Sequence, residues 1–289
     1  MPVASQKGLM RKKLKRQIAS ACCIVVGCLL LLYPWISSRW QESRAVSAVA
    51  EYKREKKLHP TAMEKVRSCA RRYNAALLQE TAVLVDPFRT DGQKNQQKLY
   101  EEVQKEIGRE ILGSVEIPAL QLKLPVYMGS TEKVLQKGAG HLEGTSLPIG
   151  GESTHAVLTG HTGLHTARLF TDLEALTTGD LFYLDILGEQ LTYRVEDILV
   201  VVPEDTQALV IQKGRDLVTL LTCTPYGIND HRLLVQGVRC QDADQPQKVT
   251  EKRSGSQWMK AYVHSLVCGG VAVFLLWCLM TWKKGTYKV

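Results

Sequence analysis

The sequence predicts a mainly β domain, preceded by helices and flanked by two membrane-spanning helices. Three observations support this fold class. Short apolar runs alternate with turn residues from residue 111 onward, which is typical of an antiparallel barrel or sandwich. Residues 39–80 are charged and alanine-rich, with apolar side chains at helical spacing. Two uncharged runs flank this body, and each has about the 20 residues that a helix needs to cross a bilayer.

Seven strands are predicted from apolar runs that end at glycine, proline or other turn residues. They are Gly113–Ile117, Leu122–Tyr127, His155–Gly160, Leu181–Ile186, Leu191–Val201, Leu217–Thr222 and Arg232–Arg239. A less regular eighth strand is expected around Ala208–Lys213. Leu135–Gly140 and Ala167–Leu176 are predicted to be short helical connections between strands.

An N-terminal helical region is predicted over residues 39–82, ahead of the strands. Pro60 divides this region into two helices, because proline is tolerated only in the first turn of a helix. We expect Tyr73, Leu77 and Leu78 to face the β domain. A further short helix is expected over Leu99–Ile107, where the β domain of residues 99–240 begins.

The two predicted membrane helices are residues 17–38 and 261–282. Lys and Arg gather beside each of them, in tails 1–16 and 283–289, so both termini are expected in the cytoplasm and the body outside. The first run resembles a signal peptide in length, but small residues suited to cleavage occur only near Ala48-Val49-Ala50, well beyond it. This favours a retained anchor. A polar tether over 241–260 connects the body to the second span.

The positive charge of the chain belongs to its tails. The net charge is +8, but the first 16 residues contain six Lys or Arg and no acidic residue, and the last seven contain three Lys. The chain between the tails is therefore close to neutral. This distribution argues against a body that binds nucleic acid.

The eight cysteines do not form a disulfide framework. Five of them fall in the two predicted spans: Cys22, Cys23, Cys28, Cys268 and Cys278. Only Cys69, Cys223 and Cys240 lie outside the spans, and their spacing does not match a zinc knuckle. A bridge between Cys69 and Cys240 is a minor alternative. An odd number of cysteines outside the spans is consistent with one working thiol.

Three chemically useful side chains stand at predicted strand ends. Cys223 ends one strand, Arg232 begins the next, and His161 ends an earlier strand beside Gly160. A thiol needs a base or an imidazolium partner to attack a carbonyl, and a guanidinium can stabilise the resulting oxyanion. His161 and His165 have the i, i+4 spacing of helical metal ligands, but the neighbouring glycines argue against a helix. We predict no metal and no other cofactor.

These motifs resemble those of the sortases. Thr219-Leu220-Leu221-Thr222-Cys223 resembles the TLxTC signature of that family, Leu158–Thr162 its histidine segment and Asn229–Val235 its arginine strand. The resemblance extends over Ile111–Val238, with the motifs in the order of the family. It implies an eight-stranded sortase barrel.

The resemblance also implies the chemistry of a cysteine transpeptidase. Cys223 would attack the Thr–Gly bond of an LPxTG-like sorting signal, His161 would protonate the leaving amine, and Arg232 would stabilise the oxyanion. Thr222 and a backbone N–H near Cys223 are expected to support the oxyanion hole. His141 resembles a loop position of the same family and is expected to be structural.

Asp86-Pro87-Phe88, within residues 83–98, is an ordinary turn initiator by composition. Ahead of a sortase barrel, however, this tripeptide resembles the lid of class C, pilus-building sortases. The resemblance implies that Asp86 lies near Arg232 and that Phe88 covers the thiol of Cys223.

The expected partners are secreted pilin or surface proteins that carry LPxTG-like signals, together with an acceptor amine. For class C this amine is a lysine of another pilin subunit. A housekeeping sortase, which uses a cell-wall precursor as acceptor, is the alternative within the family. Outside it, a non-enzymatic surface binding module and a hydrolytic cysteine protease stay open.

Overall fold

The computed structural model describes residues 27, 33, 36–37, 40–41, 43–54, 60–79, 100–101, 104–105, 111–163, 167–240, 264 and 267–270. The chain divides into two compact units, one of Met1–Trp40 with Tyr262–Val289 and one of Gln41–Ala261. In the first unit the described residues are helical. Among the described residues no helix has the length and apolar character needed to cross a bilayer. Most of both predicted spans, and all of the predicted tails, lid segment and tether, lie outside those residues.

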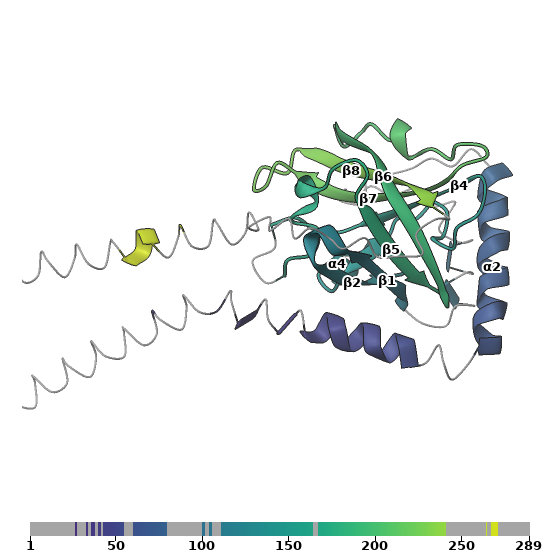
Figure 1. The fold of residues 1–289 in the computed structure, drawn as a ribbon, viewed down its shortest axis with the longest axis horizontal. Coiled ribbons are helices and arrows are strands. Elements are labelled where there is room, and N and C mark those ends of the chain that lie inside the picture. Colours follow the sequence, from purple (N-terminus) through teal and green to yellow (C-terminus); the bar gives the residue numbers. More distant parts are fainter. Residues whose placement is uncertain are drawn as a thin grey trace, which may run out of the picture. The chain divides into compact units, whose positions relative to one another are not determined.

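The second unit contains a closed barrel of eight strands (Figure 1). Around the barrel the strands follow the order β1-β2-β3-β4-β7-β8-β6-β5. The pairs β2–β3 and β4–β7 are parallel, and the other neighbours are antiparallel. This confirms the predicted mainly β barrel. The strands are β1 (Ile111–Ile117), β2 (Leu122–Tyr127), β3 (Ala139–His141), β4 (Thr154–Thr159), β5 (Leu181–Ile186), β6 (Glu189–Val201), β7 (Asp216–Thr224) and β8 (His231–Cys240).

The predicted eighth strand was wrong. Around Ala208–Lys213 the chain instead has a 3-10 turn, η3 (Gln207–Leu209), and then a loop. The missing strand is β3, within a segment that was expected to be helical. The helix there, α4 (Glu132–Leu135), is only one turn long. Gly140 pairs with Tyr127 and Thr159 in this strand, and a Cβ at this position would lie 2.4 Å from the carbonyl oxygen of Gly129. Three residues are also too few to display a strand alternation.

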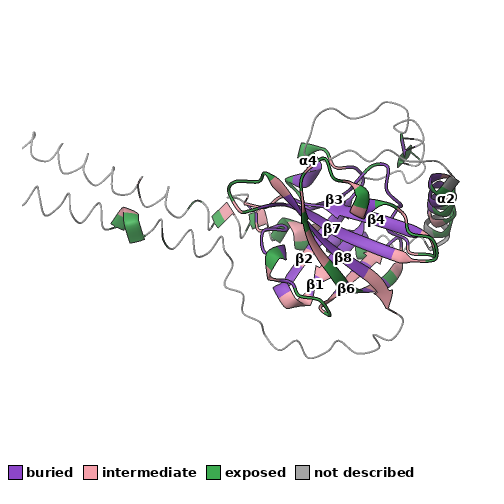
Figure 2. Cartoon of the chain, turned by 90° about the horizontal axis from the view of Figure 1, so that it is seen from above, coloured by how far each residue is buried: buried purple, intermediate pink, exposed green. Residues whose placement is uncertain are grey.

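Two apolar clusters cover the two faces of the central strands. The larger cluster includes Leu158 of β4 and Leu220 of β7, and the smaller one includes their chain neighbours Val157 and Leu221. Since successive strand residues point to opposite faces, the larger cluster fills the barrel and the smaller one lies outside it. Strand β4 is therefore buried along its whole length, and β7 along all but its first residue (Figure 2).

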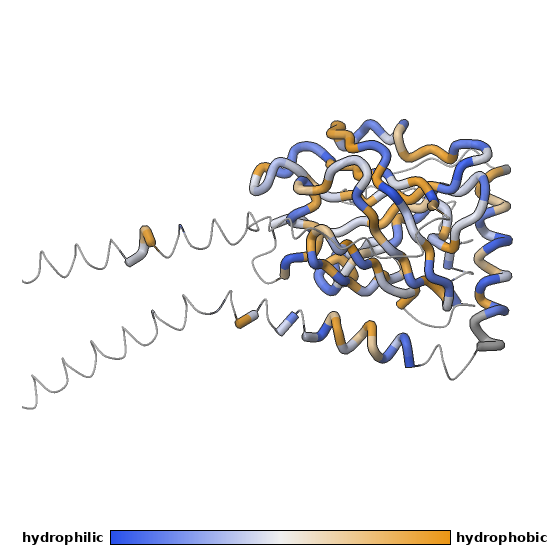
Figure 3. The backbone as a smooth tube through the Cα atoms, viewed as in Figure 1, coloured by the Kyte–Doolittle hydropathy of each residue, from blue (hydrophilic) through white to orange (hydrophobic). Residues whose placement is uncertain are grey.

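Two helices precede the barrel, at residues 43–54 and at α2 (Pro60–Gln79), on either side of Pro60 as predicted. Apolar and polar residues alternate along α2 at the spacing of an amphipathic helix (Figure 3). Tyr73 and Leu77 are buried on its barrel side, as expected. Leu78, which we also expected to be buried, is 52% exposed. One helical step of 100° from Leu77 carries it out of the contact.

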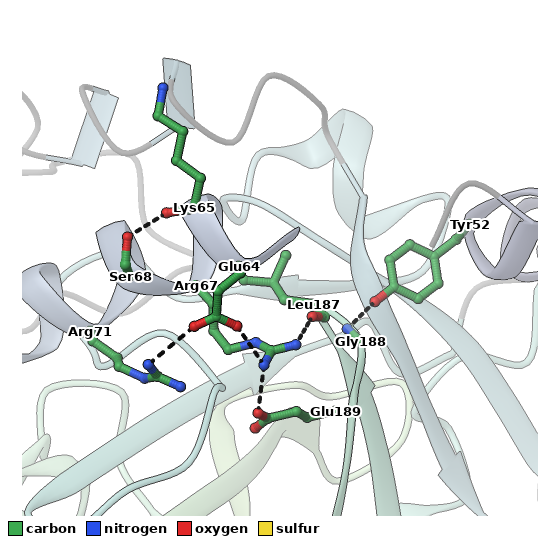
Figure 4. Close-up of polar contacts among 9 residues, drawn as sticks. All are labelled: Tyr52, Glu64, Lys65, Arg67, Ser68, Arg71, Leu187, Gly188 and Glu189. Carbon is green, nitrogen blue, oxygen red and sulfur yellow. Dashed lines mark hydrogen bonds and ion pairs between the residues drawn. The ribbon is translucent and has the colours of Figure 1, made fainter. Parts of the chain in front are cut away.

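Both helices bind the turn between β5 and β6 (Figure 4). The Arg67 guanidinium donates to the carbonyl oxygen of Leu187 at 2.9 Å and to the carboxylate of Glu189 at 2.8 Å. The backbone N–H of Gly188 donates to the hydroxyl oxygen of Tyr52 at 3.1 Å. The Arg67 side chain is 17% exposed and that of Glu189 is 42% exposed, so these bonds are only partly shielded from solvent.

Farther along α2, Asn74 attaches the helix to the loop between β3 and β4. Its side-chain amide donates to the carbonyl oxygen of Leu147 at 3.0 Å, and the N–H of Leu147 donates to its side-chain oxygen at 2.7 Å. Asn74 is only 6% exposed, so both bonds are buried. Water cannot replace these two hydrogen bonds unless α2 separates from the loop. Asn74 should therefore contribute strongly to the packing of α2 against the barrel.

We predict that Asn74→Ala lowers the free energy of unfolding by about 1–3 kcal/mol, the usual range when buried backbone groups lose their partners. Urea unfolding followed by circular dichroism measures this change. Arg72→Ala on the exposed side of α2 is the matched control and should change stability by less than about 0.5 kcal/mol. Equal effects of the two substitutions would contradict the anchoring role of Asn74.

Candidate active site

Cys223 and Arg232 lie directly opposite each other in the antiparallel pair β7–β8. Residues in this position project from the same face of a sheet, with Cβ atoms about 5 Å apart. Cys223 is 8% exposed and Arg232 is 7% exposed. Arg232 is therefore not a solvent-facing charge. The sequence placed the two residues at adjoining strand ends, and the register shows that they are neighbours across the ladder.

The parallel pair β4–β7 carries His161 to the same place. Thr159, at the end of β4, is in register with Leu221. The N–H of Gly160 then donates to the carbonyl oxygen of Leu221 at 3.0 Å, which continues the ladder by one residue. His161 is the next residue, so the chain delivers it beside the position of Cys223. The three predicted catalytic residues thus converge at the ends of β4, β7 and β8.

Thr222 secures this junction. Its hydroxyl donates to the carbonyl oxygen of Gly160 at 2.7 Å, and Thr222 is only 1% exposed. Alternation along β7 directs its side chain away from the face of Cys223. The bond therefore gives Thr222 a positioning role for the segment that carries His161. Direct support of an oxyanion by Thr222 stays a prediction.

Close packing also holds the segment after β4. A Cβ on Gly160 would lie 2.8 Å from the ring of Phe170, so only glycine fits there without a shift of the ring. The N–H of Phe170 donates to the carbonyl oxygen of His161 at 3.1 Å. Sequence analysis used Gly160 only as evidence against a helix. The structure shows that it also admits the aromatic ring that supports the histidine backbone.

The Arg232 guanidinium is held by one carbonyl group of the turn before β8 and one of the first residue of β8. Its Nη1 donates to the carbonyl oxygens of Asn229 at 3.2 Å and His231 at 3.1 Å. Asn229 adopts a left-handed conformation with φ of 62°, which asparagine tolerates better than most residues. A buried cation held by fixed dipoles is a preorganised donor, and such donors stabilise developing negative charge.

His161 also has an acidic partner that the sequence did not predict. Its Nε2 lies 3.2 Å from a carboxylate oxygen of Glu132, on α4. The histidine side chain is 19% exposed and the glutamate side chain is 65% exposed. The two residues are 29 positions apart, and no spacing rule connects them. Only the location of α4 beside the end of β4 brings them together.

A buried apolar cluster adjoins these three residues on the same outer face. It is the smaller cluster, in which Leu221 lies two residues before Cys223 and Leu234 two residues after Arg232. Partly buried side chains of β6 and η3 border it. The cluster consists of Leu142, Val157, Leu209, Leu221 and Leu234, with Leu199, Val201 and Ala208 at its edge.

The predicted lid residues Asp86, Pro87 and Phe88 lie outside the described residues. The described residues on either side of this segment bind neighbouring parts of the barrel. Asn74 binds the backbone of Leu147 in the loop after β3, and the Tyr100 hydroxyl lies 2.8 Å from Nδ1 of His141, the last residue of β3. Sequence analysis did not identify these attachments, because they depend on contacts between distant parts of the chain.

His141 is structural, as expected. Its Nε2 lies 2.9 Å from the carbonyl oxygen of Ser146, which can only accept, so Nε2 carries the hydrogen. Nδ1 therefore accepts from the Tyr100 hydroxyl, and that hydroxyl accepts from the N–H of Gly129 at 2.9 Å. The imidazole is completely buried and stacks on the Tyr100 ring. Burial lowers the pKa of His141 to about 4, against backbone hydrogen bonds that act in the opposite direction.

Cys69, Cys223 and Cys240 are free thiols, so the alternative bridge between Cys69 and Cys240 is not formed. Within the described ranges, no three His, Cys, Asp or Glu residues are grouped so that they could hold a metal ion. His165, considered as a ligand beside His161, lies outside those ranges.

Comparison with known proteins identifies relatives of the same barrel. A family model described as the sortase domain matches residues 115–240. Sortase A of Bacillus anthracis is 33% identical over 129 residues, which cover 45% of this chain and 60% of that protein. The match thus spans less than two thirds of this curated relative.

Solved structures match over a longer part of the chain. Sortase C-1 from Actinomyces oris is 47% identical, with a TM-score of 0.57, and the match covers 62% of this chain and 98% of that one. Sortase C from Clostridium perfringens, solved with the C-terminal cell wall sorting motif, is 41% identical with a TM-score of 0.58. That match covers 68% of this chain and 99% of the other.

We predict that His141 makes the protein less stable in acid. The unfolded state binds a proton below about pH 6.5 while the folded state stays neutral at this residue down to about pH 4. The free energy of unfolding should therefore fall by about 3 kcal/mol through this window because of His141. Urea unfolding at pH 7 and pH 4 should show a smaller fall for His141→Gln. An equal fall in both proteins would contradict the assignment.

Proposed function

Since the chain belongs to the sortase family, we propose that it is a cysteine transpeptidase that cleaves an LPxTG-like sorting signal between Thr and Gly. The observation that carries the proposal is the placement of Cys223 opposite Arg232, beside the strand end that delivers His161. A nucleophile, a proton carrier and a fixed cationic donor are the groups that acyl transfer requires.

In the first half of the reaction, the thiolate of Cys223 attacks the carbonyl carbon of the signal's threonine. The carbonyl electron pair moves onto oxygen, and the guanidinium of Arg232 donates hydrogen bonds to the oxyanion that forms. Such donors typically lower a barrier by about 3–4 kcal/mol. When the tetrahedral intermediate collapses, the C–N bond breaks and His161 gives a proton to the departing glycine amine. The product is a thioester on Cys223.

In the second half, an amine attacks the thioester. His161 takes a proton from the attacking amine, the new amide bond forms, and the C–S bond breaks to return the thiolate of Cys223. An amine acceptor distinguishes a transpeptidase from a hydrolytic cysteine protease, which would use water at this step.

The apolar cluster beside the thiol supports a substrate of this type. Leu221 and Leu234 lie on the face of Cys223 and Arg232, but each is only 2% exposed. Leu199, Val201 and Ala208 at the edge of the cluster are only partly buried, so they are the members that a substrate can reach. The leucine and proline of an LPxTG-like signal precede its threonine, and we expect these apolar side chains to contact that edge.

We place the enzyme in class C, where the acceptor is a lysine of another pilin subunit and the product is an isopeptide bond. The solved structures cited above are both class C enzymes at 41–47% identity, and Asp86-Pro87-Phe88 resembles the lid motif of this class. A cell-wall precursor amine is the alternative acceptor. Spans at 17–38 and 261–282 would hold the enzyme at the membrane surface, which raises its effective concentration toward anchored substrates.

We predict that the full-length chain forms a thioester with an LPxTG-type peptide. Intact mass should rise by the mass of the peptide truncated after threonine, and an added lysine amine should remove the adduct. Cys223→Ala should form none. His161→Ala should abolish transfer while it leaves the unfolding midpoint unchanged.

His231→Ala is the matched control for the histidine, because His231 is partly exposed beside Arg232. It should retain transfer. An adduct that forms on the Cys223→Ala protein, or turnover retained by His161→Ala, would contradict the assignments. A protein with no adduct in any form would favour a binding module.

The lid makes a separate prediction. Replacing Asp86 and Phe88 with alanine should speed alkylation of Cys223 by a thiol reagent about 10-fold, if the closed form covers the thiol about 90% of the time. Thr90→Ala, just beyond the tripeptide, serves as the control and should leave the rate unchanged. Equal rates in all three proteins would remove the lid role.

A further inference from the structure

We propose that Glu132 is a positioning residue for His161, and that Gln136 holds Glu132 in place. The inference rests on the proposed function, because it gives His161 a defined orientation for that reaction. It adds a carboxylate to the constellation of Cys223, His161 and Arg232. The observation behind it is the 3.2 Å separation between Nε2 of His161 and Oε2 of Glu132.

The position of Glu132 is fixed by the short helix that carries it. In α4 the N–H groups of Val134 and Leu135 both donate to the carbonyl oxygen of Thr131, at 2.9 and 3.0 Å. Val134 and Leu135 are buried, so they hold the turn against the barrel although Glu132 faces outward. The glutamate therefore extends from a fixed backbone toward the end of β4.

Gln136 orients the carboxylate itself. Its side-chain amide donates to Oε1 of Glu132 at 2.9 Å, across one turn of chain. Oε1 is thus engaged by Gln136, and Oε2 is the oxygen that meets the imidazole. The two bonds form a chain from Gln136 through Glu132 to His161. A second bond of this kind restricts the rotamers of an otherwise exposed side chain.

The contact assigns a role to each ring nitrogen of His161. An ionised carboxylate only accepts hydrogen bonds, so Nε2 carries the hydrogen in this pair. Nδ1 is then the nitrogen that exchanges a proton with the thiol side of the site. A base whose tautomer is selected by a third group is a general arrangement in nucleophilic catalysis, and the acidic group also stabilises the imidazolium that forms.

Because Glu132 is exposed, loss of its contact with His161 should lower kcat only modestly. Its side chain is 65% exposed, and ion pairs in solvent contribute little because water and salt screen them. We therefore expect a loss of about 10-fold in kcat when the contact is removed, less than the roughly 100-fold or more that a proton carrier itself contributes. A buried carboxylate in the same role would matter far more.

Nitrogen NMR of the full-length chain tests the inference without any substrate. Histidine labelled with 15N shows which ring nitrogen carries hydrogen, and His161→Gln identifies the signal among the seven histidines. In the wild type Nε2 of His161 should be protonated. Glu132→Ala should move the His161 nitrogen shifts, while Lys133→Ala, a neighbouring exposed position on α4, should not. Unchanged shifts in Glu132→Ala would overturn the inference.

Steady-state kinetics of Glu132 variants distinguishes orientation of His161 by a hydrogen bond from an effect of the negative charge of Glu132. Glu132→Gln keeps an acceptor oxygen, so kcat for peptide transfer should fall less than about 3-fold, against about 10-fold for Glu132→Ala, with KM unchanged in both. Gln136→Ala should give an intermediate loss, and Lys133→Ala none. Wild-type kcat in Glu132→Ala, or a loss shared by Lys133→Ala, would overturn the inference. If the wild type transfers no peptide, the proposed function fails, and the NMR result alone decides the role of Glu132.

Discussion

The parallel pairing of β4 with β7 is the constraint on which the site depends. It places Gly160 beside Thr222, 62 residues later in the chain. Gly160 accepts a hydrogen bond from the Thr222 hydroxyl and donates one to the carbonyl oxygen of Leu221. Parallel neighbours require a long crossover connection, so no local turn could create this contact. Antiparallel pairing of β7 with β8 then adds the arginine. Backbone pairing thus brings the predicted nucleophile, Cys223, close to the segment after β4 that carries the predicted base, His161.

Burial determines how these groups behave. Cys223 and Arg232 are nearly inaccessible, and β4 and β7 are covered on both faces by apolar clusters. Electrostatic interactions are stronger where water is excluded, so a fixed guanidinium stabilises an oxyanion more effectively there than in solvent. His161 lies at the margin of this region, where its ring is partly exposed and meets a carboxylate that is mostly in water. Arg232 is therefore shielded from solvent, whereas His161 is partly accessible to it.

A second buried polar network lies at the end of β3 and in the loop that follows it. His141, Tyr100 and the N–H of Gly129 form one chain of hydrogen bonds, and Asn74 binds the loop after β3 at Leu147. Buried networks of this kind are stable only when every member has a partner. Here Asn74 of α2 supplies hydrogen bonds to the barrel loop at Leu147, so this helix is part of the same folded unit as the barrel.

The sequence by itself determined the class of fold and the approximate position of seven strands, and it identified Cys223, His161 and Arg232 as candidate catalytic residues. Strand patterns and motifs are properties of neighbouring residues, and a single chain displays them directly. The three-residue strand β3 was missed because so short a segment has no pattern of its own. The partner of His161 at Glu132 and the burial of His141 were decided only by tertiary structure. Each depends on segments that meet because the closed barrel packs them together, and packing sums contributions from the whole chain rather than from any local stretch.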